Sequence, residues 1–175
     1  AACGSTSNAS PAWAAGQPME ASAYPHQIAF NVLAQIGSVK DVPGWTTEEC
    51  KLKRETHKIL GDESIRVSTT CVRVPVVNGH SEALHVEFKN PMTAAMAREI
   101  LEKAEGVRVV DDMSKAEYPM PIVASGQEDV LAGRIRDDDS AENAIALFVA
   151  GDNLWKGAAQ NAIQIGEKMI EMGLK

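Results

Sequence analysis

Residues 65–89 constrain the fold of this chain more than any other part of the sequence. The first half of this run, residues 65–77, is dense in β-branched side chains, and residues 80–89 alternate apolar and polar side chains. Between them stands Asn78-Gly79, the dipeptide most typical of a two-residue hairpin turn. We therefore predict two neighbouring antiparallel strands joined by a tight turn at Asn78-Gly79.

A helix is predicted before this hairpin. The sequence TTEE at residues 46–49 has the spacing of a capping box, in which Thr46 caps the helix and Glu49 follows three residues later. The helix is expected to end near Leu60, because Gly61 suits the left-handed position that follows many helices.

Further elements are predicted after the hairpin. A second helix is expected over residues 93–104, with an apolar face formed by Met96, Ile100 and Ala104. A last helix is expected after the cap residue Asp152. Short apolar strands are predicted at residues 107–110, 130–136 and 144–150. Helices and strands in this mixed order predict an α+β domain.

The composition limits the class of protein. The 175 residues carry a net charge of -7 with a pI near 5.1, and 45% of them are hydrophobic. An ordinary apolar fraction argues against a disordered chain, and no apolar run reaches the roughly 20 residues of a membrane span. The acidic balance argues against a nucleic-acid or membrane-surface partner, because phosphate groups attract clustered Lys and Arg.

The cysteines indicate the compartment. Cys3, Cys50 and Cys71 are odd in number and form no Cys-x-x-Cys pair. This pattern fits neither a disulfide framework nor a zinc site, so we predict a reduced, cytoplasmic protein. The first residues combine no basic leader with an apolar segment, so no signal peptide is expected.

Charge is distributed unevenly along the chain. Residues 1–39 contain neither Lys nor Arg, and residues 1–21 are rich in Ala, Ser, Gly and Pro. Residues 1–21 are therefore predicted to form a flexible tail or a linker remnant. A folded α+β domain is predicted over residues 22–152, and residues 153–175 are predicted to contain a separate C-terminal helix.

Several charged residues are candidates for a site. On the first predicted helix, one face carries Glu48, Lys51, Glu55 and Lys58, and an exposed ladder of ion pairs is the simpler interpretation of that spacing. Arg73 lies in an otherwise apolar run. Its guanidinium either reaches water at a sheet edge or binds an anion such as a carboxylate.

Two further candidates flank the predicted turn. His80 opens the second predicted strand, where it is well placed for proton transfer near neutral pH, although a plain surface histidine is the simpler alternative. Cys71 lies on the same predicted strand face as Arg73 and is either a nucleophile or a small core residue. The sequence contains no Walker loop, no His-Glu-x-x-His metal motif and no Gly-x-Gly-x-x-Gly fingerprint, so no metal site is predicted.

Five blocks of the sequence, in order from Tyr24 to the end of the chain, carry a resemblance to a known family. They are YPHQIAFNV at 24–32, EECK and ETHKILG within 48–61, CVRVPV and GHSE within 71–82, GRIR at 133–136, and GDNL and KGAA within 151–159. Together they resemble the C-terminal domain of aspartate-β-semialdehyde dehydrogenases. The resemblance implies a mixed, largely antiparallel sheet with helices on one face, like the C-terminal domain of glyceraldehyde-3-phosphate dehydrogenases.

The resemblance also implies an activity. Enzymes of this family carry out the NADPH-dependent reductive dephosphorylation of L-aspartyl-4-phosphate to L-aspartate 4-semialdehyde. The product feeds the biosynthesis of lysine through diaminopimelate, and of methionine and threonine. In this chemistry a cysteine thiolate attacks the acyl phosphate, phosphate leaves, and hydride reduces the thioester. NADP as cofactor, a homodimer, and aspartyl phosphate, aspartate semialdehyde and phosphate as small-molecule partners are implied in the same way.

Residue roles follow from the resemblance by motif position. His80 resembles the acid/base histidine that activates the cysteine, and Arg73 resembles the arginine that holds the substrate carboxylate with two parallel hydrogen bonds. Glu48 resembles the acid that contacts the substrate amino group, and Lys51 resembles a phosphate-binding lysine. Asn153 resembles the asparagine near the nicotinamide. For Glu48 and Lys51 this functional interpretation replaces the ion-pair ladder.

The chain also departs from the family pattern. Family members carry a dinucleotide-binding domain with a Gly-rich turn, and a nucleophilic cysteine between Asn and Ser or Thr. Neither pattern occurs here, Cys3 lacks that context, and Trp155 stands where Arg is common. We therefore expect the substrate-binding and dimerisation part of such an enzyme without its cofactor domain, so that the last helix lacks its packing partner. A non-catalytic interaction module and a related acyl-phosphate reductase acting on another acid stay open as alternatives.

Overall fold

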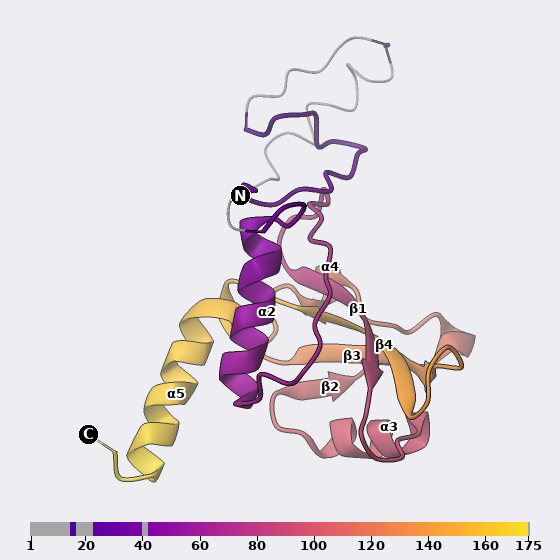
Figure 1. The fold of residues 1–175 in the computed structure, drawn as a ribbon, viewed down its shortest axis with the longest axis vertical. Helices are drawn as coiled ribbons and strands as arrows, with labels where there is room; N and C mark the ends of the chain where they lie inside the picture. Colours follow the sequence, from indigo (N-terminus) through magenta and orange to yellow (C-terminus); the bar gives the residue numbers. More distant parts are fainter. Residues whose placement is uncertain (1–14, 17–22, 40–41, 175) are drawn as a thin grey trace. The chain divides into compact units, whose positions relative to one another are not determined.

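The computed structural model describes residues 15–16, 23–39 and 42–174 (Figure 1). The chain divides into two compact units, Ala1–Pro75 and Val76–Lys175. Helix α2 and an extended segment belong to the first unit, and a sheet with several helices belongs to the second. None of the helices in the described ranges is long and apolar enough to cross a membrane.

Helix α2 spans Thr47–Leu60, and both of its predicted caps are confirmed. Thr46 Oγ1 accepts a hydrogen bond from the Glu49 N–H at 3.4 Å, and the Glu49 carboxylate accepts one from the Thr46 N–H at 2.7 Å. Gly61 follows the helix with φ at 65°, and its N–H donates to the carbonyl of His57. These contacts satisfy backbone groups that have no partner within the helix, so α2 begins and ends where the sequence indicates.

The predicted hairpin at Asn78-Gly79 is wrong. Residues 65–77 are extended, but they form no regular strand, and Arg73 pairs with the residues before α2 in an isolated bridge. Pro75 has no N–H to donate to a ladder, and the N–H of Cys71 donates to a carboxylate of helix α2 instead. A run rich in β-branched residues therefore stays extended without joining the sheet.

The second unit contains a four-stranded sheet in the order β1-β4-β3-β2. The strands are β1 at His80–Glu87, β2 at Val107–Val109, β3 at Val130–Asp137 and β4 at Ala144–Gly151. β4 pairs antiparallel with both β1 and β3, and β2 pairs parallel with β3. This mixed, largely antiparallel sheet confirms the predicted α+β class, but β1 takes β4 as its partner in place of the residues that precede it.

Helix α3, at Ala94–Lys103, covers one face of the sheet. Its buried Ala97 packs against the core residues of β3 and β4, which are Ile135, Ile145 and Leu147. The apolar face predicted for this helix is wrong, because Met96 and Ile100 are exposed. Ala97 and Leu101, one turn apart, face the sheet instead, and the small Ala97 side chain lets the helix approach closely.

Two shorter helical turns connect β2 to β3: η2 at Met113–Lys115 and α4 at Pro121–Ala124. The last residue of α4, Ala124, is fully buried against Leu131 of β3 and Ala150 of β4. Side chains alternate along a strand, so Ala150 points away from the face that α3 covers. The longer helix thus lies on one face of the sheet, and the single turn of α4 contacts the other.

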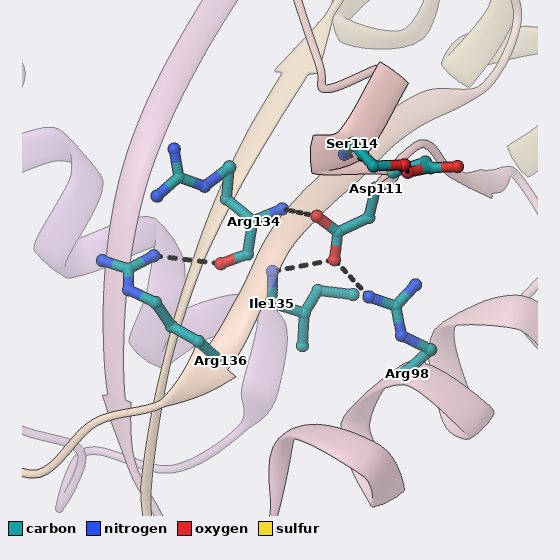
Figure 2. Close-up of polar contacts among 7 residues, drawn as sticks. Arg98, Asp111, Ser114, Arg134, Ile135 and Arg136 are labelled. Atoms are coloured by element: carbon teal, nitrogen blue, oxygen red, sulfur yellow. Dashed lines mark hydrogen bonds and ion pairs between the residues drawn. The ribbon is translucent and has the colours of Figure 1, made fainter. Parts of the chain in front are cut away.

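An irregularity in β3 is stabilised by one buried carboxylate (Figure 2). The pairing with β4 shifts within residues 133–136, and Arg134 there adopts φ at 56°, a conformation that costs a residue with a side chain roughly 1–3 kcal/mol. Asp111 accepts the N–H groups of Arg134 at 2.7 Å and Ile135 at 3.1 Å, and it forms an ion pair with Arg98 of α3. Figure 2 shows the Arg134 guanidinium pointing away from this carboxylate.

Beyond β4 the chain forms a π-helical turn, η3 at Trp155–Ala159, and then helix α5 at Gln160–Glu171. In η3 the N–H of Ala159 donates to the carbonyl of Leu154, five residues earlier, at 3.2 Å. The predicted last helix is thereby confirmed, and its loss of a packing partner stays a prediction. Several apolar side chains of α5 are exposed, namely Ile163, Ile165, Met169 and Ile170.

Asp111→Ala is expected to lower the free energy of unfolding by about 3 kcal/mol, because it leaves two backbone N–H groups and a guanidinium without their acceptor. Urea denaturation followed by circular dichroism measures this change. The control is Glu99→Ala, since Glu99 forms an exposed ion pair with Lys103 whose loss costs about 0.5 kcal/mol or less. Equal losses in the two variants would contradict the role given to Asp111.

Candidate functional site

Glu48 and Lys51 lie one turn apart at the start of α2. Lys51 Nζ is 3.2 Å from Glu48 Oε1, and both side chains are at least one third exposed. The pKa of Lys51 is raised above its ordinary value by the hydrogen bond to Glu48, then by the negative charge of Glu48, with smaller contributions from Glu55 and Cys71. The first turn of α2 therefore presents an anionic and a cationic group side by side.

The next residue, Glu49, is buried, in contrast to these neighbours. Its Oε2 accepts the N–H of Thr46 at 2.7 Å, and its Oε1 accepts the N–H of Cys71 at 2.9 Å. The hydrogen bond from Thr46, followed by that from Cys71, lowers the pKa of Glu49 against the opposing effect of burial. One carboxylate thus connects the first turn of α2 to the segment that leads to Arg73.

Arg73 is half-buried, and both its backbone and its side chain have partners. Its N–H donates to the Leu33 carbonyl at 2.8 Å, and its own carbonyl accepts from the Leu33 N–H at 3.1 Å. Its guanidinium lies 4.8 Å from the centre of the Tyr24 ring, a cation–π contact. The ring contact does not use the N–H donors at the edge of the guanidinium as hydrogen-bond donors to oxygen, so the planar fork still suits a carboxylate.

The segment before Arg73 runs alongside α2 (Figure 1). In the last turn of the helix, His57 Nε2 donates to the Ile65 carbonyl at 2.8 Å. In the first turn, Glu49 accepts from Cys71. Two side chains of one helix therefore fix both ends of residues 65–71, and Cys71 lies at the end of α2 that carries the predicted substrate contacts.

In the second unit, His80 is the first residue of β1 and pairs in register with Gly151, the last residue of β4. The His80 side chain is exposed. The N–H of the preceding Gly79 donates to Asn153 Oδ1 at 2.7 Å. The predicted acid/base residue and the predicted cofactor contact therefore lie at the same end of the β1–β4 pair.

Asp152 connects several segments of the chain at this end of the sheet. Asp152 is 2% exposed, and its Oδ1 accepts the N–H groups of Leu154 and Trp155 in the turn that follows. The prediction that Asp152 caps the last helix is wrong, because α5 begins at Gln160 and its N-cap residue is Ala159. The Asp152 carboxylate accepts four hydrogen bonds in total: from the Asn78 side-chain amide and from the backbone N–H groups of Gly126, Leu154 and Trp155. The Gly126 N–H is the largest cause of a lowered pKa at Asp152, against the effect of burial. Three stretches of chain that are distant in sequence thus converge on one carboxylate.

The predicted site residues form two groups. Glu48, Lys51 and Arg73 belong to the first unit, and His80 and Asn153 belong to the second. The roles that the resemblance gives to these five residues stay predictions. Among the described residues, no cluster of three His, Cys, Asp or Glu side chains is arranged to hold a metal ion.

The cysteines of the described ranges, Cys50 and Cys71, are half-buried free thiols. Cys3 lies outside the described residues. An open hollow of about 590 Å³ lies beside α3 and β2, and it contains none of the predicted site residues. One of its carboxylates, Asp111, already holds the irregular part of β3, so this hollow is not the candidate site.

Sequence reasoning missed the residues that support the candidate site. Tyr24 stands at the start of the first family-like block, yet nothing in that block indicates that its ring lies under Arg73. The sequence predicts Glu49 as part of a capping box, but its contact with Cys71 joins positions 22 residues apart. One feature of the sequence does indicate a buried role for Glu49: this acidic residue lies on the side of α2 that faces away from the exposed charges.

Comparison with known proteins gives a family. A family model described as "semialdehyde dehydrogenase, dimerisation domain" matches residues 4–156. The aspartate-semialdehyde dehydrogenase of Aquifex aeolicus is 47% identical to this chain over 168 residues, which cover 95% of this chain and 49% of that relative.

Two solved structures are also similar. Aspartate semialdehyde dehydrogenase II of Vibrio cholerae, complexed with ASA, is 41% identical with a TM-score of 0.86, and the match covers 95% of this chain and 48% of that one. The enzyme of Candida albicans, with NADP, is 26% identical with a TM-score of 0.66, over 81% of this chain and 45% of that one. This chain spans about half the length of the relatives it matches.

Asp152→Asn is expected to lower the free energy of unfolding near pH 7 by about 2 kcal/mol, because an amide cannot accept with both of its terminal atoms. The lowered pKa of Asp152 fixes the pH dependence. Its contribution is complete above the unfolded pKa of about 4 and is lost as the pH falls through the lower folded pKa. Urea denaturation near pH 7 and near pH 3 should therefore show a difference from wild type that shrinks in acid.

The matched control is Glu128→Gln, which neutralises an exposed carboxylate near the same end of the sheet. It should change the free energy of unfolding by about 0.5 kcal/mol or less at either pH. A loss in Asp152→Asn that does not depend on pH would show that the charge of Asp152 is not what stabilises this end of the unit.

Proposed function

We propose that this chain, which belongs to the semialdehyde dehydrogenase dimerisation-domain family, is the substrate-binding and dimerisation part of an aspartate-semialdehyde dehydrogenase. The reaction of the whole enzyme is the NADPH-dependent reductive dephosphorylation of L-aspartyl-4-phosphate to L-aspartate 4-semialdehyde. It serves amino-acid biosynthesis in the cytoplasm, toward lysine through diaminopimelate and toward methionine and threonine.

The arrangement at the first turn of α2 is the observation that carries this proposal. The substrate has a carboxylate, an ammonium group and a phosphate, and the first unit offers a charge of opposite sign for each. Arg73 matches the carboxylate with its planar fork, Glu48 matches the ammonium group, and Lys51 matches the phosphate as a compact point charge. The complex of the Vibrio cholerae relative with ASA supports the same substrate class.

His80 is proposed to act as a general base. Its exposed imidazole at the first residue of β1 takes the proton from a cysteine thiol, which becomes the attacking thiolate. The thiolate then forms a bond to the acyl carbon, and the bond from that carbon to the phosphate oxygen breaks, so that phosphate leaves. We assign the thiol to the dinucleotide-binding part of the enzyme, because none of Cys3, Cys50 and Cys71 stands between Asn and Ser or Thr, as the family's nucleophile does.

NADPH, when bound, supplies the hydride that reduces the resulting thioester. One residue of this chain fits a contact with it. The Gly79 N–H donates to Asn153 Oδ1, which leaves the Nδ2 group of the same amide as a donor for an acceptor such as a carboxamide oxygen. The sequence has no Gly-rich turn for the cofactor phosphates, so we assign those to the dinucleotide-binding domain. The NADP in the Candida albicans relative supports this choice of cofactor.

Arg73→Lys is expected to weaken the binding of L-aspartate to this chain roughly ten-fold, because an ammonium group cannot reproduce the two parallel hydrogen bonds of a guanidinium. Isothermal titration calorimetry measures the affinity. Arg54→Lys, a change of the same kind on the exposed side of α2, is the control and should leave the affinity unchanged. Equal affinities in wild type and Arg73→Lys would remove Arg73 from the site.

A homodimer is the second expected property, and the dimerisation domain of the family supports it. Sedimentation equilibrium at micromolar concentration should give twice the chain mass of 18.7 kDa. A monomer at that concentration would contradict the dimerisation role. A chain that dimerises but binds no L-aspartate would favour the alternative of a non-catalytic interaction module.

A further inference from the structure

We propose that Glu49 is a positioning residue, which holds the segment carrying Arg73 against the turn of α2 that carries Glu48 and Lys51. The inference rests on the proposed function, in which these three residues contact the substrate. Glu49 itself is buried and contacts no substrate in this proposal.

The two carboxylate oxygens of Glu49 accept hydrogen bonds from different parts of the chain. Oε2 accepts the Thr46 N–H, and this contact alone completes the capping box of α2. Oε1 accepts the N–H of Cys71, which lies 22 residues further along the chain. Helix capping does not require the contact with Cys71. We therefore infer that this contact acts on the segment that contains Cys71 and Arg73.

The contact with Cys71 reaches the candidate site through a short piece of extended chain. Arg73 follows two residues later, about 7 Å along the chain, and side chains two residues apart lie on the same side. Leu33 holds the backbone of Arg73 through two hydrogen bonds. The position of the guanidinium relative to α2 therefore depends on both the Glu49 contact and the Leu33 contacts.

Helix geometry places Cys71 close to the substrate contacts of α2. The Cys71 N–H donates to Glu49 Oε1 at 2.9 Å, and Glu49 lies in the same helical turn as Glu48 and Lys51. Lys51 in turn is paired with Glu48 at 3.2 Å. The point that Glu49 fixes is thus next to the two charges whose spacing from Arg73 must match the substrate.

A carboxylate is suited to this bridge in a way that its amide is not. Both oxygens of Glu49 accept from N–H donors, and charged acceptors make the stronger hydrogen bonds. In Glu49→Gln one of the two oxygens becomes an NH₂ group, which would face an N–H donor. One of the two contacts must then open, and a displacement of about 1 Å is enough to impair a site that depends on orientation.

Loss of a helix cap is the competing explanation for any effect of Glu49→Gln, and Thr46→Ala separates the two. Thr46→Ala removes the hydroxyl that caps the Glu49 N–H, at a cost of about 1 kcal/mol to the helix. It leaves the Thr46 and Cys71 backbone N–H groups on the Glu49 carboxylate. Thr46→Ala therefore damages the cap and spares the bridge.

The experiment measures L-aspartate affinity by isothermal titration calorimetry in wild type, Glu49→Gln, Thr46→Ala and the exposed control Glu63→Gln. We expect roughly ten-fold weaker binding in Glu49→Gln, and changes within about two-fold in the other two variants. Circular dichroism verifies that each variant is folded. Amide hydrogen exchange by NMR, measured without ligand, should show faster exchange at Cys71 in Glu49→Gln alone.

Each outcome decides one of the two proposals. Wild-type affinity in Glu49→Gln, or equal losses in Glu49→Gln and Thr46→Ala, would overturn the positioning role. If wild type binds no L-aspartate, the proposed function fails at this site, and the exchange measurement alone then judges Glu49. Unchanged protection of Cys71 in Glu49→Gln would overturn the bridge in that case as well.

Discussion

Buried carboxylates that accept backbone N–H groups hold the irregular parts of this chain in place. Glu49, Asp111 and Asp152 each accept at least two such groups, and each lies within a helix or within two residues of the end of a strand. A buried N–H without an acceptor costs roughly 1–3 kcal/mol, so a segment outside the helices and the sheet needs acceptors of another kind. A carboxylate offers two on one side chain. The irregular segments thus take their positions from the helix that contains the acid or from the strand that precedes it.

The residues proposed for function depend on these same acids. Arg73 lies in a segment without regular strand pairing, and Asn153 lies in the turn that follows β4. Glu49 connects the first of these segments to α2, and Asp152 connects the second to the beginning of β1. Active-site side chains commonly lie on irregular chain that a rigid scaffold supports, and here the support consists of a few charged hydrogen bonds.

Short sequence patterns predicted the parts of the fold that depend on residues close together in the sequence. The caps Thr46 and Gly61 and the ranges of the four strands follow from patterns a few residues long, and they were confirmed. The hairpin at Asn78-Gly79 was wrong because β1 pairs with a strand near the end of the chain, a choice that no local pattern encodes. The candidate site residues came from the resemblance to a family. The contacts that support them, such as that of Tyr24 with Arg73, join positions too far apart in sequence for periodicity to reveal.

The π-helical turn η3 sets the direction in which the last helix presents its side chains. An α-helix advances by about 100° per residue, and a π turn accommodates one more residue than an α turn does. The stripe of α5 that contains Ile163 and Ile170 is therefore rotated by about 100° from where an uninterrupted α-helix starting at Asp152 would carry it. The one additional residue of the π turn thus rotates all side chains of the C-terminal helix about the helix axis. A surface that recognises this stripe would therefore depend on the number of residues that precede α5 as much as on the residue types in the stripe.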